Sequence, residues 1–368
     1  MESSRMKQLD RLGQSLWIDY IRRDFISGGE LRKIIEEYGL KGMTSNPAIF
    51  EKAILESNVY REPILAMRAA GKDAGAIYEA LSQEDVQSAA DVFRPVYDRT
   101  GGKDGYVSLE VNPHLAHDTG GTVGEARRLW NALDRPNVMI KIPATREGLP
   151  AIHQMVREGI NVNATLIFGV ERYRQVAQAY MKGIEDRIAD HQPVDHVASV
   201  ASFFLSRIDT LIDPMLQQRQ SGAAEELAKK VYGQVAVASA KTAYQSYKRL
   251  FESGQFAEMR DKGAAVQRLL WASTGTKNPQ FSDLKYVEPL IGQDTVNTLP
   301  VDTFQAFIDH GNPTPTLEEQ TAEAKAVLRA LPTLGIDLDG ILDRLENEGI
   351  QKFIEPFEKL LFTIETFQ

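Results

Sequence analysis

The chain contains no cysteine, and that absence excludes several kinds of chemistry at once. Without thiols there is no disulfide, no thiolate zinc site and no cysteine nucleophile. Histidine is also scarce, with six in 368 residues. His114 and His117, followed by Asp118, have no further histidine at a useful spacing, so we expect neither a metal site nor a metal cofactor.

Basic excess, nucleotide-binding loops and long apolar runs are missing too. The 42 Lys and Arg against 51 Asp and Glu give a net charge of −9, which argues against nucleic acid as a partner. Neither GxGxxG nor GxxxxGK[ST] occurs. No segment approaches the roughly 18 apolar residues of a membrane span, and the amino terminus lacks the apolar core of a signal peptide. We expect no membrane association and a cytoplasmic location.

What is present is an alternation of β-rich and helical segments. We predict eight strands, at Leu16–Ile21, Leu40–Ser45, Tyr106–Val111, Asn137–Ile142, Ile160–Ile167, His196–Phe204, Leu269–Ser273 and Tyr286–Ile291. Between them lie amphipathic helices such as Val170–Ile188, whose apolar residues follow a 3.6-residue period. This string predicts a (β/α)8 (TIM) barrel, although a doubly wound open sheet would give a similar one.

The helical segments are uneven in length. Enlarged crossovers separate the second strand from the third and the sixth from the seventh. Capping-box spacing predicts helix starts at Thr122 and at Thr316. No linker divides the chain, so we predict one domain over residues 1–368, with 316–368 as a C-terminal helical extension that could cap the barrel, form a homodimer contact, or both.

Lys141 is the most informative single residue. It stands alone among apolar neighbours in Asn137-Val-Met-Ile-Lys-Ile-Pro-Ala-Thr145, which otherwise reads as a buried parallel strand. Burying an ammonium is costly and favours the free amine, which can attack a carbonyl to form a Schiff base. The alternative is a lysine whose stem packs while its charged head reaches an ion pair.

Two acids are embedded in other predicted strands in the same way. Glu110 lies between Leu109 and Val111, and Asp19 lies between Ile18 and Tyr20. In a barrel, residues near the carboxyl ends of the strands converge on one mouth. An amine with two carboxylates suits imine chemistry, in which one acid moves protons through the carbinolamine and the other deprotonates a hydroxyl during carbon–carbon cleavage. Alternatively, the acids only neutralise the lysine.

Neutral polar residues and two cations complete the candidate site. Asn46, Asn163 and Thr165 could hold substrate hydroxyls or an ordered water, or could bond the backbone instead. The predicted seventh strand ends in hydroxyl residues, a glycine and Lys277, a combination that can bind phosphate. Arg207, just beyond the sixth strand, is a second candidate cation or a solvated helix residue.

Six segments, in this order, resemble the successive strand motifs of the transaldolase family over about residues 16–311. They are Gly42-Met-Thr-Ser-Asn-Pro47, Ser108-Leu-Glu-Val-Asn112, Met139-Ile-Lys-Ile-Pro-Ala-Thr145, Asn161-Val-Asn-Ala-Thr-Leu-Ile-Phe168, Ala201-Ser-Phe-Phe-Leu-Ser-Arg-Ile-Asp209 and Leu270-Trp-Ala-Ser-Thr-Gly-Thr-Lys-Asn-Pro279. The resemblance implies a class I aldolase-type barrel of the pentose phosphate pathway that needs no metal or organic cofactor. It implies transfer of a dihydroxyacetone unit from sedoheptulose 7-phosphate to glyceraldehyde 3-phosphate, giving erythrose 4-phosphate and fructose 6-phosphate.

The resemblance also implies roles for individual residues. Lys141 matches the Schiff-base lysine, Asp19 the acid that deprotonates the hydroxyl beyond the broken bond, and Glu110 the acid that works through a water. The remaining matches are Thr165 for positioning that water, Asn46 and Asn163 for the dihydroxyacetone hydroxyls with Thr44 and Ser202 nearby, and Arg207 and Ser273 for phosphate.

One position departs from the family pattern. Much of the family has an arginine two residues after the position of Ser273, where this chain has Gly275. We expect Lys277 to take its place. After cleavage the enamine on Lys141 must be shielded until an acceptor aldehyde arrives, and we expect the C-terminal extension to help cover it. Two alternatives remain open: a fructose-6-phosphate aldolase that releases free dihydroxyacetone, and a catalytically silent sugar-phosphate-binding barrel.

Overall fold

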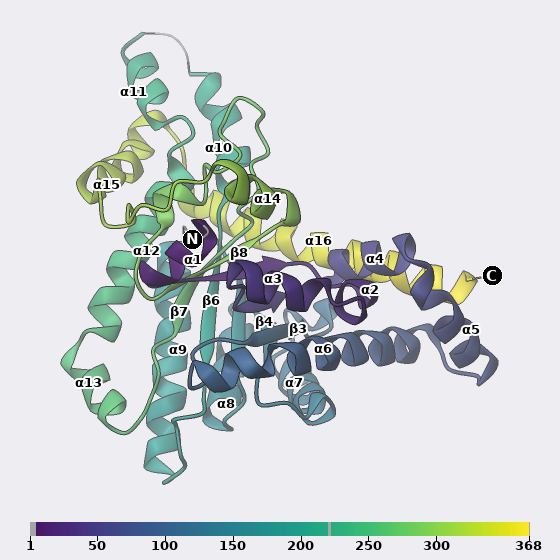
Figure 1. Ribbon diagram of the computed structural model, residues 1–368. Helices are drawn as coiled ribbons and strands as arrows, with labels where there is room; N and C mark the ends of the chain where they lie inside the picture. The colour runs from purple at the N-terminus through teal and green to yellow at the C-terminus, as the bar shows by residue number, and fades with distance from the viewer. Residues whose placement is uncertain (1–4, 220–221, 368) are drawn as a thin grey trace.

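Eight parallel strands form a closed barrel in the order β1 to β8 in the computed structural model, which describes residues 5–219 and 222–367 (Figure 1). The strands are β1 Gln14–Asp19, β2 Gly42–Thr44, β3 Tyr106–Glu110, β4 Val138–Pro143, β5 Val162–Ile167, β6 Ser199–Phe204, β7 Arg268–Ala272 and β8 Thr295–Leu299. Closure comes from β1 and β8, which pair from Gln14 with Thr295 to Ile18 with Leu299. The predicted (β/α)8 barrel is therefore confirmed, and the open sheet is excluded.

The predicted eighth strand was wrong. Residues Tyr286–Ile291 contain the 3₁₀ turn η3 (Glu288–Leu290), and the strand follows at Thr295–Leu299. The apolar residues of this segment are nevertheless buried. The turn is attached to the barrel through the Leu290 carbonyl, which accepts hydrogen bonds from Gln14 Nε2 at 2.8 Å and from Trp271 Nε1 at 3.0 Å. The strand-like apolar pattern thus belongs to a buried loop. The true strand was missed because its threonines and asparagine make it look polar.

Helices surround the barrel and occupy both enlarged crossovers, as predicted (Figure 1). They are α1 Arg5–Arg11, α2 Arg23–Ser27, α3 Glu30–Tyr38, α4 Pro47–Glu56, α5 Arg61–Ala69, α6 Ala74–Arg99, α7 Thr119–Leu133, α8 Gly148–Arg157, α9 Val170–Ala189, α10 Ser206–Gln217, α11 Ala223–Val231, α12 Val235–Phe251, α13 Gly254–Asp261, α14 Val301–His310, α15 Thr321–Ala330 and α16 Leu338–Thr366. Further 3₁₀ turns are η1 Asn58–Tyr60, η2 Pro113–Leu115 and η4 Pro332–Leu334. The apolar stripe predicted from Val170 is buried in α9.

Both helix starts predicted from capping-box spacing were wrong. Helix α7 begins at Thr119, because Asp118 caps it by accepting a hydrogen bond from the Gly121 amide at 2.9 Å. Thr122 lies inside that helix and donates to the Leu115 carbonyl at 2.9 Å. Helix α15 begins five residues after Thr316, whose hydroxyl donates to the Glu288 carbonyl. In both cases the threonine hydroxyl donates a hydrogen bond to a carbonyl outside the helix and does not accept one from a helix amide.

A buried ion pair closes the amino-terminal end of the barrel. Arg268 Nη2 lies 3.0 Å from Asp104 Oδ1, and Asp104 is only 1 % exposed. Ser15 Oγ donates to Asp104 Oδ2 at 2.8 Å and accepts from Arg268 Nη1 at 2.7 Å. Burial alone would raise the pKa of Asp104, but Arg268 and Lys41 outweigh burial and hold that pKa below its usual range. The side chains of Asp104, Arg268 and Ser15 close the amino-terminal end, so we expect the active site at the carboxyl-terminal end.

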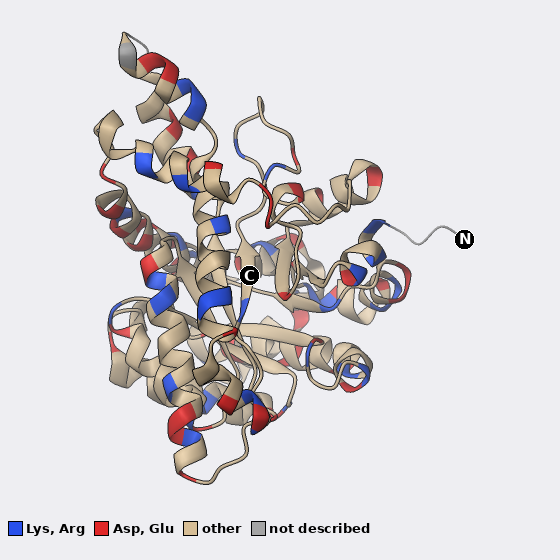
Figure 2. Ribbon diagram, turned by 90° about the vertical axis from the view of Figure 1, so that its left-hand side faces the viewer, with Lys and Arg blue, Asp and Glu red and all other residues tan. Residues whose placement is uncertain are grey.

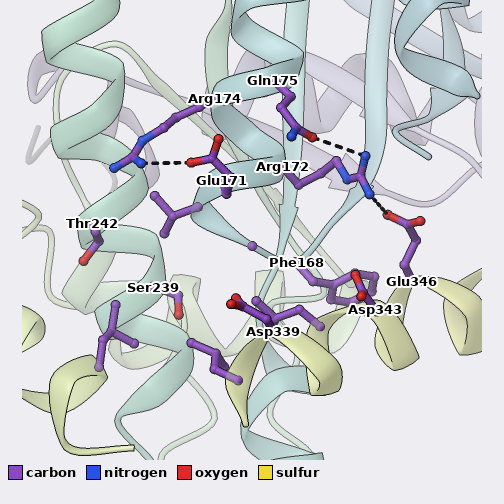
Figure 3. Close-up of a pocket in the computed structure, with 15 residues that line it drawn as sticks. Phe168, Glu171, Arg172, Arg174, Gln175, Ser239, Thr242, Asp339, Asp343 and Glu346 are labelled. Carbon is purple, nitrogen blue, oxygen red and sulfur yellow. Dashed lines mark hydrogen bonds and ion pairs between the residues drawn. The ribbon is translucent and has the colours of Figure 1, made fainter. Parts of the chain in front are cut away.

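Helix α16 lies across the carboxyl-terminal mouth. It packs on α4, α6, α10 and the end of β5, and Figure 1 shows it running from the α10 side of the barrel to α4. At Gly349 a Cβ would sit 3.1 Å from Leu166 Cδ2, so the helix approaches β5 closely. An ion pair between Arg172 Nη2 and Glu346 Oε2 at 3.3 Å ties α16 to α9, beside a groove of about 460 Å³ (Figure 3).

Charges of both signs are interspersed along the helices. In Figure 2 the helices nearest the viewer carry alternating blue and red segments rather than a continuous basic stripe. Within the described ranges, no helix combines the length and the apolar character that crossing a bilayer requires.

Candidate active site

Lys141 is buried inside the barrel beside a carboxylate. It lies in β4 with 4 % of its surface exposed, and its Nζ donates to the Ser45 carbonyl at 3.0 Å. Glu110 Oε2 lies 3.4 Å from the same nitrogen. The parallel register sets Lys141 directly between Glu110 on β3 and Asn163 on β5. The lysine head therefore points to interior partners rather than to solvent.

Asp19 ends β1 and faces the same interior. Its Oδ1 accepts a hydrogen bond from Thr44 Oγ1 at 2.6 Å, and Thr44 Oγ1 lies 2.8 Å from Thr298 Oγ1. Burial raises the pKa of Asp19, and the opposing effects of Lys141, Thr44 and Arg207 do not cancel that rise. This carboxylate is a stronger base than an exposed aspartate, which suits proton abstraction.

Glu110 is buried beside Lys141. It is 7 % exposed, and apart from the Lys141 ion pair neither carboxyl oxygen has a hydrogen-bond partner among residues 5–219 and 222–367. Burial, with a contribution from Asp19, raises the pKa of Glu110 to about 7 despite the attraction of Lys141. A carboxyl group with such a pKa can give and take a proton near neutral pH.

Asn163 is held by two serines, Ser108 on β3 and Ser202 on β6. Its Nδ2 donates to Ser108 Oγ at 3.0 Å, and Ser202 Oγ donates to its Oδ1 at 2.7 Å. Thr165 lies further along β5, fully buried, and no described residue hydrogen-bonds to its Oγ1, so that oxygen can bind a water or a substrate oxygen.

The Asn46 side chain bonds the backbone, which was the alternative to substrate binding. Its Oδ1 accepts the Ile49 amide at 3.1 Å and caps α4. The capping bond fixes the side chain at the end of β2, next to Ser45, whose carbonyl accepts from Lys141. The Nδ2 group makes no hydrogen bond within residues 5–219 and 222–367, so it can still bind a substrate hydroxyl.

Ser273 is bonded to Ser206, the residue before Arg207. The Ser206 amide donates to the Ser273 carbonyl at 3.0 Å, and their hydroxyls are 2.9 Å apart, which joins the start of α10 to the end of β7. Arg207 Nη1 is buried with no hydrogen-bond partner in the described ranges, and its guanidinium lies 5.5 Å from the Phe204 ring centroid. Burial lowers the pKa of Arg207, although Asp19 and Glu348 oppose this. An unpaired cation in such a place is suited to an anion.

Lys277 is exposed on the loop after β7. Its Nζ lies 3.9 Å from the point where a Cβ on Gly275 would stand. The lysine also lines a small cavity of about 190 Å³ with Asp209 and Asp213. The structure thus places an ammonium beside the position where the family carries its arginine, at the edge of the mouth rather than deep inside it.

Two residues near the lysine and the aspartate were not predicted as site residues. Phe353, on α16, is 3 % exposed, and its ring centroid lies 5.4 Å from Lys141 Nζ. In the sequence it is one apolar residue of an amphipathic helix, and nothing there ties it to β4. Thr298 belongs to the strand that was misplaced; the alternation in Thr295–Leu299 was the signal that could have found it.

The histidines considered as metal ligands have other neighbours. His114 Nε2 lies 3.4 Å from Glu358, His117 Nδ1 lies 3.2 Å from Glu147, and Asp118 caps α7. In the part of the chain that the structure describes, no three His, Asp or Glu residues gather as metal ligands would.

Comparison with known proteins assigns the family. The model of the Transaldolase/Fructose-6-phosphate aldolase family matches residues 16–364. A protein named Transaldolase 2 from Nostoc sp. is 46 % identical, over 99 % of this chain and 98 % of its own. Proteins named Transaldolase from Thiobacillus denitrificans and Acidothermus cellulolyticus are 45 % and 47 % identical, over 97 % and 96 % of this chain and 99 % and 94 % of their own. The chain belongs to the transaldolase/fructose-6-phosphate aldolase family.

Proposed function

We propose that this protein is a transaldolase that works through a Schiff base on Lys141. The observation that carries the proposal is the buried Lys141 Nζ, 3.4 Å from a Glu110 carboxyl whose pKa burial raises to about 7. A buried amine next to an acid that titrates near neutrality is what formation and dehydration of a carbinolamine require.

The proposed reaction begins when Lys141 attacks the ketone of sedoheptulose 7-phosphate. Glu110, through a water positioned by Thr165, protonates the carbinolamine oxygen, and water leaves as the iminium forms. Asp19 then removes the proton from the hydroxyl beyond the bond that breaks, releasing erythrose 4-phosphate and leaving an enamine on Lys141. Glyceraldehyde 3-phosphate accepts the enamine carbon, and hydrolysis of the new imine releases fructose 6-phosphate.

Substrate recognition is divided between the interior and the rim. Asn46 and Asn163, with Thr44 and Ser202 nearby, would hold the dihydroxyacetone hydroxyls. Arg207 and Ser273 would bind phosphate together with Lys277, which stands in for the missing arginine. Arg207 Nη1 and the Thr165 hydroxyl support these assignments, because both are buried polar groups without a partner among the residues that the structure describes.

A fructose-6-phosphate aldolase is the second candidate, since the matching family model covers both activities. Product analysis separates the two. Given fructose 6-phosphate alone, a transaldolase releases little free dihydroxyacetone and needs an acceptor such as erythrose 4-phosphate to turn over. Steady release of dihydroxyacetone without an acceptor would instead assign the aldolase activity.

We also propose that the enzyme is cytoplasmic and forms a homodimer. Absence of cysteine is compatible with a reducing compartment. Four large apolar side chains are exposed on α4, η1, α5 and α16, namely Leu55, Val59, Leu65 and Phe362. Light scattering on the purified protein tests the dimer, and a monomer mass at micromolar concentration would contradict it. Cell fractionation tests the location.

A further inference from the structure

A cavity of about 190 Å³ reaches Glu110 from the helical layer rather than from the mouth. We call it the Glu110 cavity. Its walls come from β3, α6, α7 and α16, and include Glu110, Tyr78, Ser82, Asn112, Arg128 and Phe357. A water needs roughly 10 to 15 Å³ of such space, so several waters fit.

The inner end of the cavity is polar. Both Glu110 oxygens are buried, and no residue in the described part of the chain gives them a hydrogen bond. Tyr78 lines the same cavity, and burial together with the Glu110 charge raises the pKa of its hydroxyl. The Tyr78 ring is held edge-on between Phe50 and Phe357, at centroid distances of 5.9 and 5.3 Å. A fixed phenol hydroxyl next to an unsatisfied carboxylate is a place for an ordered water.

The outer end of the cavity lies between α6 and α7, where charged side chains join the two helices. Arg128 on α7 pairs with Glu79 on α6 and, at 2.8 Å, with Glu125 on its own helix. All three side chains line the cavity and are partly exposed. Ionised, hydrated groups of this kind place solvent at the outer end.

The proposed reaction needs water to pass while the mouth is covered. Formation of the imine breaks the carbinolamine C–O bond and releases one water as Glu110 gives up its proton. Hydrolysis adds one water to the iminium carbon and returns a proton to Glu110, so oxygen and proton balance over the cycle. Phe353, on α16, lies with its ring centroid 5.4 Å from Lys141 Nζ and so covers the lysine on the mouth side.

We infer that the Glu110 cavity is the route by which this water leaves and returns, and that Tyr78 is a positioning residue that orients it toward Glu110. The inference rests on the proposed function. It assigns the water of imine formation and hydrolysis to a path separate from the sugar entrance.

Filling the cavity tests the inference. Ser82→Leu places an apolar side chain in the Glu110 cavity, while Ser88→Leu makes the same change at an exposed position of the same helix. We expect Ser82→Leu to lower kcat by about tenfold or more, with little change in KM, because proton transfer through water contributes at least that much. Filling the cavity should slow both formation and hydrolysis of the imine, so the Lys141 imine trapped with borohydride should accumulate more slowly after substrate is added. Ser88→Leu should match the wild type in both.

Tyr78→Phe is the second variant, and it keeps the aromatic packing. It should lower kcat and shift the limb of the pH profile that reports Glu110, which a purely structural tyrosine would not do. The inference is overturned if Ser82→Leu keeps the kcat and imine accumulation of the wild type and Tyr78→Phe keeps its kcat and pH profile. If Ser82→Leu does not fold, the result for Tyr78→Phe decides alone. A wild-type protein that gives no trapped imine would instead overturn the proposed function.

Discussion

Glu110 shows how burial sets chemistry at the scale of a single residue. Burial removes the carboxylate from water, and the described residues do not replace the lost hydration with hydrogen bonds. The acid form is therefore favoured, and the pKa of Glu110 rises to about 7. Lys141, one strand away, is the cation that keeps the carboxylate form accessible. Each residue explains why the other can be tolerated inside the barrel.

The raised pKa predicts the pH dependence of activity. In the proposed mechanism Glu110 is the acid that expels water from the carbinolamine, so kcat should fall as pH rises through about 7. In Glu110→Gln this limb should disappear, along with most of the activity, by about 100-fold or more. A pH profile of kcat for both proteins checks this. An unchanged limb in the variant would assign it to another group.

The same pKa predicts a stability effect with a definite sign. Because the pKa of Glu110 is higher in the folded state than its ordinary 4.5, the folded protein binds the extra proton. The contribution to the free energy of unfolding is complete below pH 4.5 and is lost as pH rises to about 7. Urea unfolding across this window should show a shallower pH slope for Glu110→Gln than for the wild type. Equal slopes would place Glu110 in contact with solvent.

Lys277 gives a prediction about phosphate. Lys277→Ala should raise KM for fructose 6-phosphate by about tenfold, since one charge-assisted bond is worth roughly 1.5 to 3 kcal/mol, and leave a phosphate-free ketose unaffected. Adding Gly275→Arg should restore KM, because a Cβ there meets its nearest neighbours at 3.4 Å or more. If Lys277→Ala keeps the wild-type KM, Arg207 and Ser273 bind the phosphate without it.

Sequence reasoning at this scale worked where the residue type was unusual for its setting. Lys141 and Glu110 stood out because charges do not belong on buried strands, and the structure brings both to one interior with Asp19. Phe353 could not be found in this way, because a phenylalanine on an amphipathic helix has an ordinary reason to be there. Their chemical roles stay predictions until tested.

At the scale of elements, α16 is the feature with the clearest expected effect on the reaction. Phe353 covers Lys141, so Phe353→Ala should admit water to the enamine and increase release of free dihydroxyacetone relative to transfer. The buried ring also stabilises the fold, and its loss should cost about 3 to 5 kcal/mol. Dihydroxyacetone is measured with and without acceptor at a temperature where the variant is folded.

Gln351→Ala is the matched control, since that side chain is exposed on the same helix. It should behave as the wild type in both product ratio and stability. If Phe353→Ala keeps release strictly coupled to transfer, α16 does not shield the intermediate.

The errors in predicting elements have a common physical cause. The apolar segment at Tyr286–Ile291 and the capping-box threonines carry real preferences, but tertiary contacts satisfied them differently. An apolar run shows that a segment is buried, not that it is a strand. The long helices and seven of the strand positions were predictable because periodicity and length agreed.

At the scale of the whole molecule, the barrel separates stability from chemistry by placing them at opposite ends. Asp104 and Arg268 close the amino-terminal end, while the candidate catalytic residues Lys141, Asp19 and Glu110 lie toward the carboxyl-terminal mouth. Alternation of strand and helix predicted the barrel but left the open sheet as an alternative, which the pairing of β1 with β8 excludes. The contacts that close it, such as Asp104 with Arg268, join residues too distant in the chain to be paired by pattern.

The buried closing pair predicts a stability loss without a catalytic one. Asp104→Asn leaves Arg268 without its counter-ion and should cost about 3 to 5 kcal/mol of unfolding free energy, with kcat per folded molecule unchanged. Asp98→Asn, which breaks an exposed pair with Arg94, should cost about 0.5 kcal/mol or less. Denaturant unfolding of the two variants gives the comparison, and equal losses would contradict the role assigned to the closing pair.

The most direct test of the central claim is to trap the imine. The protein is incubated with fructose 6-phosphate and borohydride, and the added mass is located by peptide mass spectrometry. The mechanism predicts a reduced dihydroxyacetone adduct on Lys141 and none in Lys141→Met. Folded wild-type protein that carries no adduct, or carries it on another lysine, would contradict the assignment of Lys141 as the nucleophile.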